Sequence, residues 1–444
     1  MLRILSASNK HPLIRGARRN GNETSVSEAF EAAFRRGAGW FALTFIFALP
    51  LIAPTARISG ETPGFRYAKP GYRFEFPRDL RPRNGYRTSW WYYTGHLYPE
   101  SAGTFTRNAD DSPGGAAKAG ATNPAEYQGK RYGFQFTIFK IENAPNPAGD
   151  YRAGNVFFMA HLALTDEKNR KYYFTERLQR RFPGMAGYDA ETRTVFVENN
   201  TLRIDDSGRK HSIRTRAEGF RLELDLQSAL GPLVHGENGI SRKGYDARSA
   251  SHYISIPDLV GEATLTIGAK GPARKLVAKS WMDIEFGSNV LSKTQTGWDW
   301  LHVSLENNER YMIFRVRDGA GRDFYSASAI DAAGRIRPVA ADRIQMQPGR
   351  VWTSPATGAR YPVEWKMVVE DTTLVVKPWI DAQEAHPDAR AGSRVSYWEG
   401  AVDVVAEKNT NDANSDANSD AAQIVRGVGY LEMTGYAGSM GGTL

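Results

Sequence analysis

The stretch WMDIEFGS (281–288) places two carboxyl groups and an indole where a β-strand is expected. Alternate side chains of a strand share a face, so Trp281, Asp283 and Glu285 point one way and the apolar residues between them point the other. Such an acidic face is turned either to water or to a cavity. A carboxyl held neutral in an apolar pocket is a proton donor, so a cavity here predicts acid catalysis with Asp283 as the acid.

Three histidines, His96, His161 and His252, lie in separate predicted strands. Three imidazoles can bind zinc, but these come from distant segments whose spacing is no metal signature. The chain has no cysteine, which also excludes thiolate sites and disulfides. We therefore expect no metal, and we expect these histidines to be hydrogen-bonded in a core or at a cavity.

The stretch SWWYYTGHL (89–97) carries large aromatic residues on both faces of a predicted strand. Both faces are therefore expected to be covered, as in a barrel wall that packs against a second domain. The aromatic side chains either form core packing or line a ligand cavity, which suits Tyr and Trp because they join apolar area to one polar group. The candidate ligand-binding residues are His96, Tyr92, His161 and Glu285.

Common catalytic motifs are missing from the sequence. There is no GxSxG, no HExxH, no P-loop and no GxGxxG after a strand. The serines in GRDFYSAS and WTSPATG have no histidine partner that the spacing indicates. The sequence therefore gives no support for a Ser-His-Asp hydrolase, and no cofactor is expected.

Short runs of aromatic and β-branched residues, separated by turn residues, fill most of the chain. Almost no segment keeps a 3.6-residue period over three turns, so the fold is predicted to be nearly all β. Many short antiparallel strands are typical of barrels or sandwiches, which remove exposed sheet edges.

The length of 444 residues is too great for one ordinary core, so two or more domains are expected. A faint internal repeat supports this: Trp281, Met282 and Asp283 are followed by Gly-Ser, and Tyr430, Leu431 and Glu432 are followed later by Gly-Ser. We interpret it as two copies of one β-fold. The predicted divisions are a leader (1–60), a first domain (61–288) and a second domain (289–444).

Two segments of low complexity, 101–125 and 407–421, interrupt the predicted strands. Neither holds enough apolar residues to offset the entropy of ordering it, so both are predicted to be solvated insertions. The second contains the repeat NDANSDANSD, for which calcium binding is the alternative.

The leader joins a basic region to a short apolar run, residues 40–53. This run is short for a membrane span and is typical of an export signal, which predicts a protein of the periplasm or cell envelope. The alternatives are that the run stays as a membrane anchor or forms a buried helix. The net charge of +8 is small and scattered, so no nucleic-acid partner is expected.

An ordered series of motifs resembles a known family. The series runs SWWYYTGHL, HLALTD, YYFTER, SRKG, SHYISIPDL, WMDIEFGS, TGWDW, WTSPATGARYPVEW, YWEG and GYLEMTGY. In this order they are similar to the AttH-like proteins, which are related to carotenoid 1,2-hydratases (hydroxyneurosporene synthases). The resemblance covers roughly residues 65 to 444, apart from the two predicted insertions.

The resemblance implies two lipocalin-like antiparallel β-barrels in tandem. In the carotenoid hydratases an aspartate in an aromatic-x-Asp stretch is the proposed acid that protonates a double bond. The matching positions here are Trp281 and Asp283, with His252 upstream as a supporting group. We expect Asp283 to face the interior of the first barrel, near Trp281 and within reach of His252 or another polar partner. Trp281 stands where the carotenoid enzymes usually have Tyr, which places this chain nearer the AttH-like branch.

Three functions are compatible with these features. The first is an exported protein that binds a hydrophobic lipid or isoprenoid in a barrel cavity and could hand it to a membrane transporter. The second is a cofactor-independent hydratase or isomerase that protonates an alkene through Asp283. The third is a structural envelope protein with filled barrels, since barrels of about eight strands can be filled or hollow.

Overall fold

The computed structural model describes residues 64–102, 124–145, 155–228, 230–288, 291–387, 395–408 and 423–441. The predicted leader and all but the ends of the two predicted insertions lie outside these ranges. Within them, no helix is long and apolar enough to cross a membrane.

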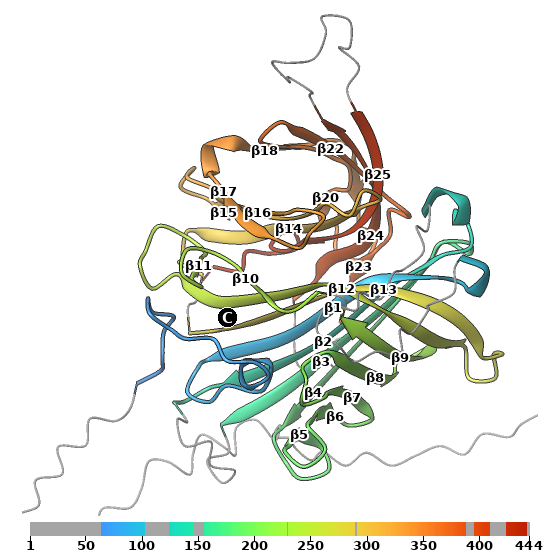
Figure 1. Ribbon diagram of the computed structural model, residues 1–444, viewed down its shortest axis with the longest axis horizontal. Helices are drawn as coiled ribbons and strands as arrows, with labels where there is room; N and C mark the ends of the chain where they lie inside the picture. Colours follow the sequence, from blue (N-terminus) through green and yellow to red (C-terminus); the bar gives the residue numbers. More distant parts are fainter. Residues whose placement is uncertain are drawn as a thin grey trace, which may run out of the picture. The chain divides into compact units, whose positions relative to one another are not determined.

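The described chain is all β, as predicted. Besides strands it contains short 3₁₀ helices, namely η2 (Arg78–Leu80), η3 (Glu100–Ala102), η4 (Pro124–Tyr127) and η6 (Ala341–Arg343). The strands form two large antiparallel sheets, each curled into a nearly closed barrel (Figure 1). The export signal that we expect before them remains a prediction.

The first sheet has 13 strands in the order β4-β3-β2-β1-β13-β12-β9-β8-β7-β6-β5, with β10 and β11 paired to β12. Their bounds are β1 (Thr88–Pro99), β2 (Tyr132–Glu142), β3 (Val156–Asp166), β4 (Lys171–Arg180), β5 (Ala186–Asp189), β6 (Thr194–Val197), β7 (Asn200–Ile204), β8 (Lys210–Arg216), β9 (Phe220–Ser228), β10 (Leu233–Val234), β11 (Ser241–Arg242), β12 (Ala250–Ile267) and β13 (Arg274–Gly287).

The second sheet has 10 strands in the order β17-β16-β15-β14-β25-β24-β22-β21-β18, with β23 paired to β24, and β19 and β20 form a separate ribbon. Their bounds are β14 (Gln295–Leu305), β15 (Arg310–Asp318), β16 (Phe324–Ile330), β17 (Ile336–Val339), β18 (Ile344–Pro348), β19 (Val351–Thr353), β20 (Arg360–Pro362), β21 (Trp365–Val369), β22 (Thr372–Pro378), β23 (Glu384–Ala385), β24 (Tyr397–Lys408) and β25 (Gln423–Met433). The chain changes sheets between β13 and β14; that each sheet is a separate domain remains a prediction.

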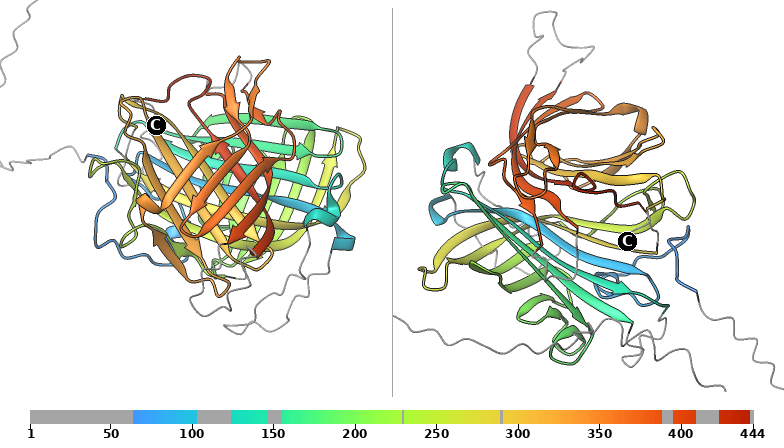
Figure 2. Two further views of the ribbon diagram at one scale, coloured as in Figure 1. Left: turned by 90° about the horizontal axis from the view of Figure 1, so that it is seen from above. Right: turned by 180° about the vertical axis from the view of Figure 1, so that it is seen from behind.

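The two sheets pack against each other through their outer faces. Strands β1 and β2 of the first contact β25 and β24 of the second, and the right view of Figure 2 shows the two sheets next to each other. An aromatic cluster lies between them, including Tyr92, Tyr253, Trp281, Trp300 and Phe314. This contact explains why the aromatic strand β1 is buried on both faces.

Each sheet also has a hydrophobic core on its inner face. In the first sheet, Met282, Ile284 and Phe286 of β13 belong to this core, together with Trp91 and Tyr93 of β1. A second core fills the other sheet. Burying large side chains on both faces supplies stabilisation without disulfides, at about 1.5–3 kcal/mol for each fully buried large apolar side chain.

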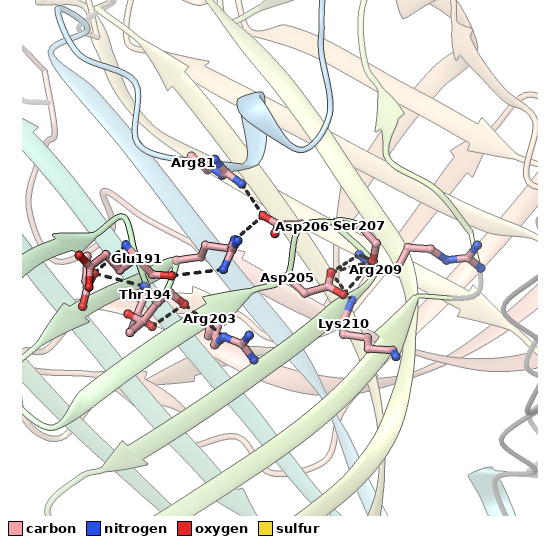
Figure 3. A network of polar contacts seen from close by, with 12 residues as sticks. Arg81, Glu191, Thr194, Arg203, Asp205, Asp206, Ser207, Arg209 and Lys210 are labelled. Carbon is pink, nitrogen blue, oxygen red and sulfur yellow. Dashed lines mark hydrogen bonds and ion pairs between the residues drawn. The ribbon is translucent and has the colours of Figure 1, made fainter.

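The hairpins at one end of the first sheet are joined by an exposed polar network (Figure 3). The Asp206 carboxylate accepts hydrogen bonds from Arg81, at 3.0 Å, and from Arg193. Asp205 accepts the backbone N–H groups of Arg209 and Lys210, at 3.1 and 3.2 Å, which closes the turn between β7 and β8. Exposed pairs of this kind contribute up to about 1 kcal/mol of stability each, so the network stabilises these turns only locally.

Candidate functional site

A cavity of about 160 Å³ lies between the two sheets. A single buried water needs about 10–15 Å³ on such a measure, so the cavity has on the order of ten times that space. Its walls are mainly aromatic and aliphatic with a few polar groups, as in small-molecule sites. The lining residues are Thr88, Trp90, Tyr92, Gln135, Phe139, Ile141, Met159, Lys243, Tyr253, Asp283, Glu285, Leu291, Trp298, Trp300, Phe314, Val316, Tyr397 and Glu432.

Strand register brings distant polar residues into one row on the face of the first sheet that borders this cavity, and two of them, Tyr92 and Asp283, line it. Asp283 of β13 is paired with Ser255 of β12 on one side and with Tyr92 of β1 on the other. The row continues through Thr137 of β2 to His161 of β3. Directly paired residues of antiparallel strands share a face, so all five face the second sheet.

The Asp283 carboxyl is buried, with 2% of its surface exposed, and accepts three hydrogen bonds. The donors are the Tyr253 hydroxyl at 2.6 Å, the Trp281 indole N–H at 2.7 Å and the Ser255 hydroxyl. Burial raises the pKa of Asp283 to about 7, although the three hydrogen bonds act in the opposite direction. The carboxyl can therefore hold or release a proton near neutral pH.

Glu285, two residues further along β13, is paired rather than free. Its carboxylate lies 2.9 Å from the Lys243 ammonium and accepts a hydrogen bond from Ser251. The ammonium also lies over the rings of Tyr253, at 4.6 Å, and Phe314, at 4.4 Å. Lys243 thus compensates the negative charge of Glu285 and fixes two aromatic walls of the cavity.

Two further carboxyl groups come from the second sheet. Glu432 accepts a hydrogen bond from the Trp298 indole N–H at 3.0 Å, and burial, with added repulsion from Glu285 and Asp283, raises its pKa to about 7. Glu399 is paired with Glu432 across β24 and β25 and accepts the Tyr92 hydroxyl at 2.6 Å. Burial and the charge of Glu432 raise the pKa of Glu399 well above its usual range.

A histidine contacts Ser255, one of the three donors to Asp283. His235 Nε2 lies 2.6 Å from Ser255 Oγ, and His235 Nδ1 lies 2.9 Å from Ser328 Oγ of the second sheet. Burial, with the nearby Lys243 charge, lowers the pKa of His235 to about 3, so its ring is neutral. Because the Ser255 hydroxyl donates to Asp283, its oxygen is left to accept Nε2–H, and Nδ1 then accepts the Ser328 hydroxyl.

The structure corrects two expectations about Asp283. Its side chain was expected to face the interior of the first barrel, but that side is filled by Met282, Ile284 and Phe286. His252 was expected within reach of Asp283, yet it lies on the opposite face of β12, against Phe286 at 5.0 Å between ring centres, with Nδ1 3.2 Å from the Gly239 carbonyl oxygen. Burial lowers the pKa of His252.

The other predicted residues are distributed along the contact between the sheets. Trp281, Glu285 and Tyr92 adjoin Asp283. His96 lines a separate cavity of about 80 Å³, with its Nε2 3.1 Å from the Gly429 carbonyl oxygen, and burial lowers its pKa to about 3. His161 lies behind Tyr397, at the far end of the row. No group of three His, Cys, Asp or Glu in the described ranges is arranged to hold a metal ion.

Several residues of the site were missed in the sequence. The sequence could have indicated Tyr253 and Ser255, because they lie on the same face of the predicted strand over residues 250–256. His252 lies on the opposite face of that strand. Glu432 occupies the position of Asp283 in the internal repeat, so the repeat could have indicated Glu432 as a site residue. Nothing in the sequence indicates His235, which lies in a loop after β10.

Comparisons with known proteins agree with this fold. A crystal structure from Nitrosomonas europaea assigned to AttH has 28% sequence identity and a TM-score of 0.66, with 84% of this chain and 99% of that chain covered. Kievitone hydratase from Nectria haematococca has 14% identity and a TM-score of 0.56, with 82% and 93% covered, which shows a shared fold. No curated protein sequence matches the chain. The family model described as AttH-like matches residues 122–436, and the chain therefore belongs to the AttH-like family.

Proposed function

We propose that this protein binds a hydrophobic small molecule between its two sheets and transfers a proton to it from Asp283, as a cofactor-independent hydratase or isomerase. The observation that carries the proposal is a buried carboxyl with a pKa of about 7 on the wall of an apolar cavity. General acids work best when their pKa lies near the working pH.

In this reaction the protonated Asp283 carboxyl gives its proton to one carbon of a double bond, and a C–H bond forms. The neighbouring carbon becomes a cation, flanked by the rings of Tyr92, Tyr253 and Trp300, which stabilise positive charge. A hydratase adds water there, and the water's extra proton returns to the carboxylate. In an isomerase the Asp283 carboxylate instead takes a proton from an adjacent carbon, so that the double bond moves and the carboxyl is restored.

Binding without chemistry is the second candidate. It is favoured by the apolar lining of the cavity, in which Trp90, Phe139, Met159 and Phe314 offer no reactive group. The cavity lies between the sheets, not inside a barrel, and the cores on the inner faces support this placement for the ligand. The hydratase neighbour from Nectria shares only the fold, so the choice depends on Asp283 itself.

Native mass spectrometry of protein purified from cells, before and after organic extraction, tests the binding step. The extracted ligand is then incubated with the protein in D₂O. A hydratase or isomerase introduces solvent deuterium into the ligand, and Asp283→Asn keeps binding but introduces none. A ligand that binds and never gains deuterium makes the protein a carrier. Protein that carries no ligand and binds none contradicts both candidates.

We also propose export to the periplasm or cell envelope, with a membrane transporter as a partner of the carrier function. The support is the basic and apolar leader, residues 1–60, in which residues 40–53 act as the signal or as an anchor. Cell fractionation followed by N-terminal sequencing tests this proposal. Soluble, full-length protein confined to the cytoplasm would contradict it.

A further inference from the structure

The cavity between the sheets also contains a buried amide with an unused acceptor. Gln135 is only 3% exposed and lines the cavity. Its Nε2 donates to Thr137 Oγ1 at 2.9 Å and to the Tyr397 hydroxyl at 3.3 Å. Within the part of the chain that the structure describes, its Oε1 has no hydrogen-bond partner. A buried carbonyl oxygen without a donor is costly, so this position favours a ligand that supplies one.

Tyr397 presents a second acceptor at the same place. Its hydroxyl lies 2.7 Å from His161 Nδ1, and His161 Nε2 lies 2.9 Å from Glu176 Oε2. A carboxylate only accepts, so Nε2–H points to Glu176 and Nδ1 is left to take the Tyr397 hydrogen. The Tyr397 oxygen then accepts from Gln135 and keeps capacity for one more donor. A hydroxyl group placed here can donate its one hydrogen to Gln135 Oε1, the acceptor that has no partner among the described residues, with Tyr397 Oη beside it.

Strand spacing sets the distance from this pair to the acid. Gln135 lies on β2, two strands from β13, which carries Asp283. Gln135 is in register with Trp281, two residues from Asp283. Neighbouring strands are about 4.8 Å apart and each residue advances about 3.4 Å along a strand, so the two residues are separated by roughly 12 Å. Trp90, Phe139 and Met159 line the same cavity from β1, β2 and β3. They lie in the row of Glu285, on the other side of Asp283 from Gln135, so the wall beyond the acid is apolar.

The charges of the cavity exclude acidic ligands. Asp283, Glu285 and Glu432 line it, and Glu399 stands behind Tyr92. Lys243 is the one cation among the lining residues, and it is already paired with Glu285. A carboxylate or phosphate ligand would therefore find no free cation among these lining residues to compensate its charge in a low-dielectric space, which is unfavourable.

We propose that the ligand is a hydrophobic alcohol or phenol whose hydroxyl donates to Gln135 Oε1, beside Tyr397 Oη, roughly 12 Å from the double bond that Asp283 protonates. This inference rests on the proposed function and adds the class of molecule. Hydrocarbons, ethers and fatty acids of the same size bind more weakly, because they lack the donor or carry the wrong charge.

Displacement of the fluorescent probe N-phenyl-1-naphthylamine from the full chain tests the proposal with three matched terpenoids. Geraniol has a hydroxyl several bonds from an isolated double bond, geranyl methyl ether lacks the donor, and geranic acid is anionic at pH 7. Geraniol is expected to bind about tenfold more tightly than the ether, as one hydrogen bond warrants, and more tightly than the acid.

Two variants test whether Gln135 and Tyr397 cause the preference for geraniol over its methyl ether. Gln135→Leu and Tyr397→Phe should bring the affinities for geraniol and its ether together, whereas the control Met159→Leu, on the apolar wall, should keep them apart. Near-ultraviolet circular dichroism checks that each variant is folded. If a variant does not fold, the comparison of geraniol with its ether on the unmodified protein still tests the proposal.

Each negative result has a different meaning. Equal affinity for geraniol and its ether overturns the hydroxyl site and leaves the proposed function standing. Tighter binding of geranic acid overturns the charge argument and with it the ligand class. Failure of the probe and all three terpenoids to bind overturns both this inference and the proposed function.

Discussion

The protonation of Asp283 follows from the balance between burial and three hydrogen-bond donors. Burial disfavours the ionised form of Asp283. The hydrogen bonds from Tyr253, Ser255 and Trp281 favour that ionised form. The outcome, a pKa of about 7, leaves both forms populated at neutral pH. A group in this state can donate a proton and take it back, which a surface aspartate cannot do efficiently.

A first prediction concerns stability and pH. The folded-state pKa of Asp283 is raised above the unfolded value, so the folded protein binds more protons between pH 4 and 7 and loses stability as pH rises through that window. From pH 5 to pH 8 this carboxyl should cost the folded state about 2–3 kcal/mol. Urea unfolding at pH 5 and pH 8 should show a smaller fall in the free energy of unfolding for Asp283→Asn than for the unmodified protein. An equal fall in both proteins would contradict the raised pKa.

A second prediction concerns the donors. Ser255→Ala removes a hydrogen bond to the Asp283 carboxylate, so the pKa of Asp283 should rise by about one unit. Carbon-13 NMR titration of labelled aspartate carboxyls measures this directly. Ser251→Ala is the matched control, because its hydroxyl lies on the same face of β12 but donates to Glu285. Identical titration of Asp283 in both variants would show that Ser255 does not tune it.

At the scale of the elements, strand β13 separates packing from chemistry by its two faces. Met282, Ile284 and Phe286 enter the core of the first sheet, and Trp281, Asp283 and Glu285 face the second sheet. Strand β12 repeats the pattern with Ser251, Tyr253 and Ser255 toward the second sheet. A residue therefore acts on stability or on the site according to its parity along the strand.

A third prediction tests this division. Ile284→Ala should lower the free energy of unfolding by about 2–4 kcal/mol, because it opens a cavity in a filled core, while ligand affinity stays within about twofold. Met159→Ala, on the cavity wall, should cost clearly less stability, because its side chain already borders open space, and should weaken binding. Denaturant titrations and probe displacement on both variants provide the test. The reverse ranking would place the core on the other face.

At the scale of the whole described molecule, the site exists only where the two sheets meet. Arg131 is one of the groups that join them. Its guanidinium lies 2.7 Å from Asp403 of the second sheet and 2.6 Å from Glu167 of the first, and it packs over the Trp379 ring at 3.9 Å. A buried charge held on several sides keeps the two sheets in one relative position.

A fourth prediction follows. Arg131→Met leaves two acidic groups without their cation, so the free energy of unfolding should fall by about 3 kcal/mol. Arg214→Met removes an exposed pair with Asp225, at 2.8 Å, and should change stability by no more than about 0.5 kcal/mol. Urea unfolding of both variants compares them. If the two substitutions cost the same, Arg131 does not hold the sheets together.

The sequence alone determined the local features of this protein. Turn residues and aromatic, β-branched runs predicted an all-β chain, and the two-residue period placed Asp283 on one face with Trp281 and Glu285. The density of aromatic residues in β1 also indicated that both of its faces are covered. These features depend on neighbours along the chain, which is why they could be predicted.

Only the tertiary structure decided which face of β13 becomes the core and what covers the other. That choice depends on the second sheet, whose strands begin more than ten residues after Asp283 and continue to Met433. It also decided the partners: His252 is out of phase with Ser251 and Tyr253 by one position, and His235 reaches Ser255 from a loop. Register and packing between distant strands set these contacts, and a one-residue shift moves a side chain to the opposite face.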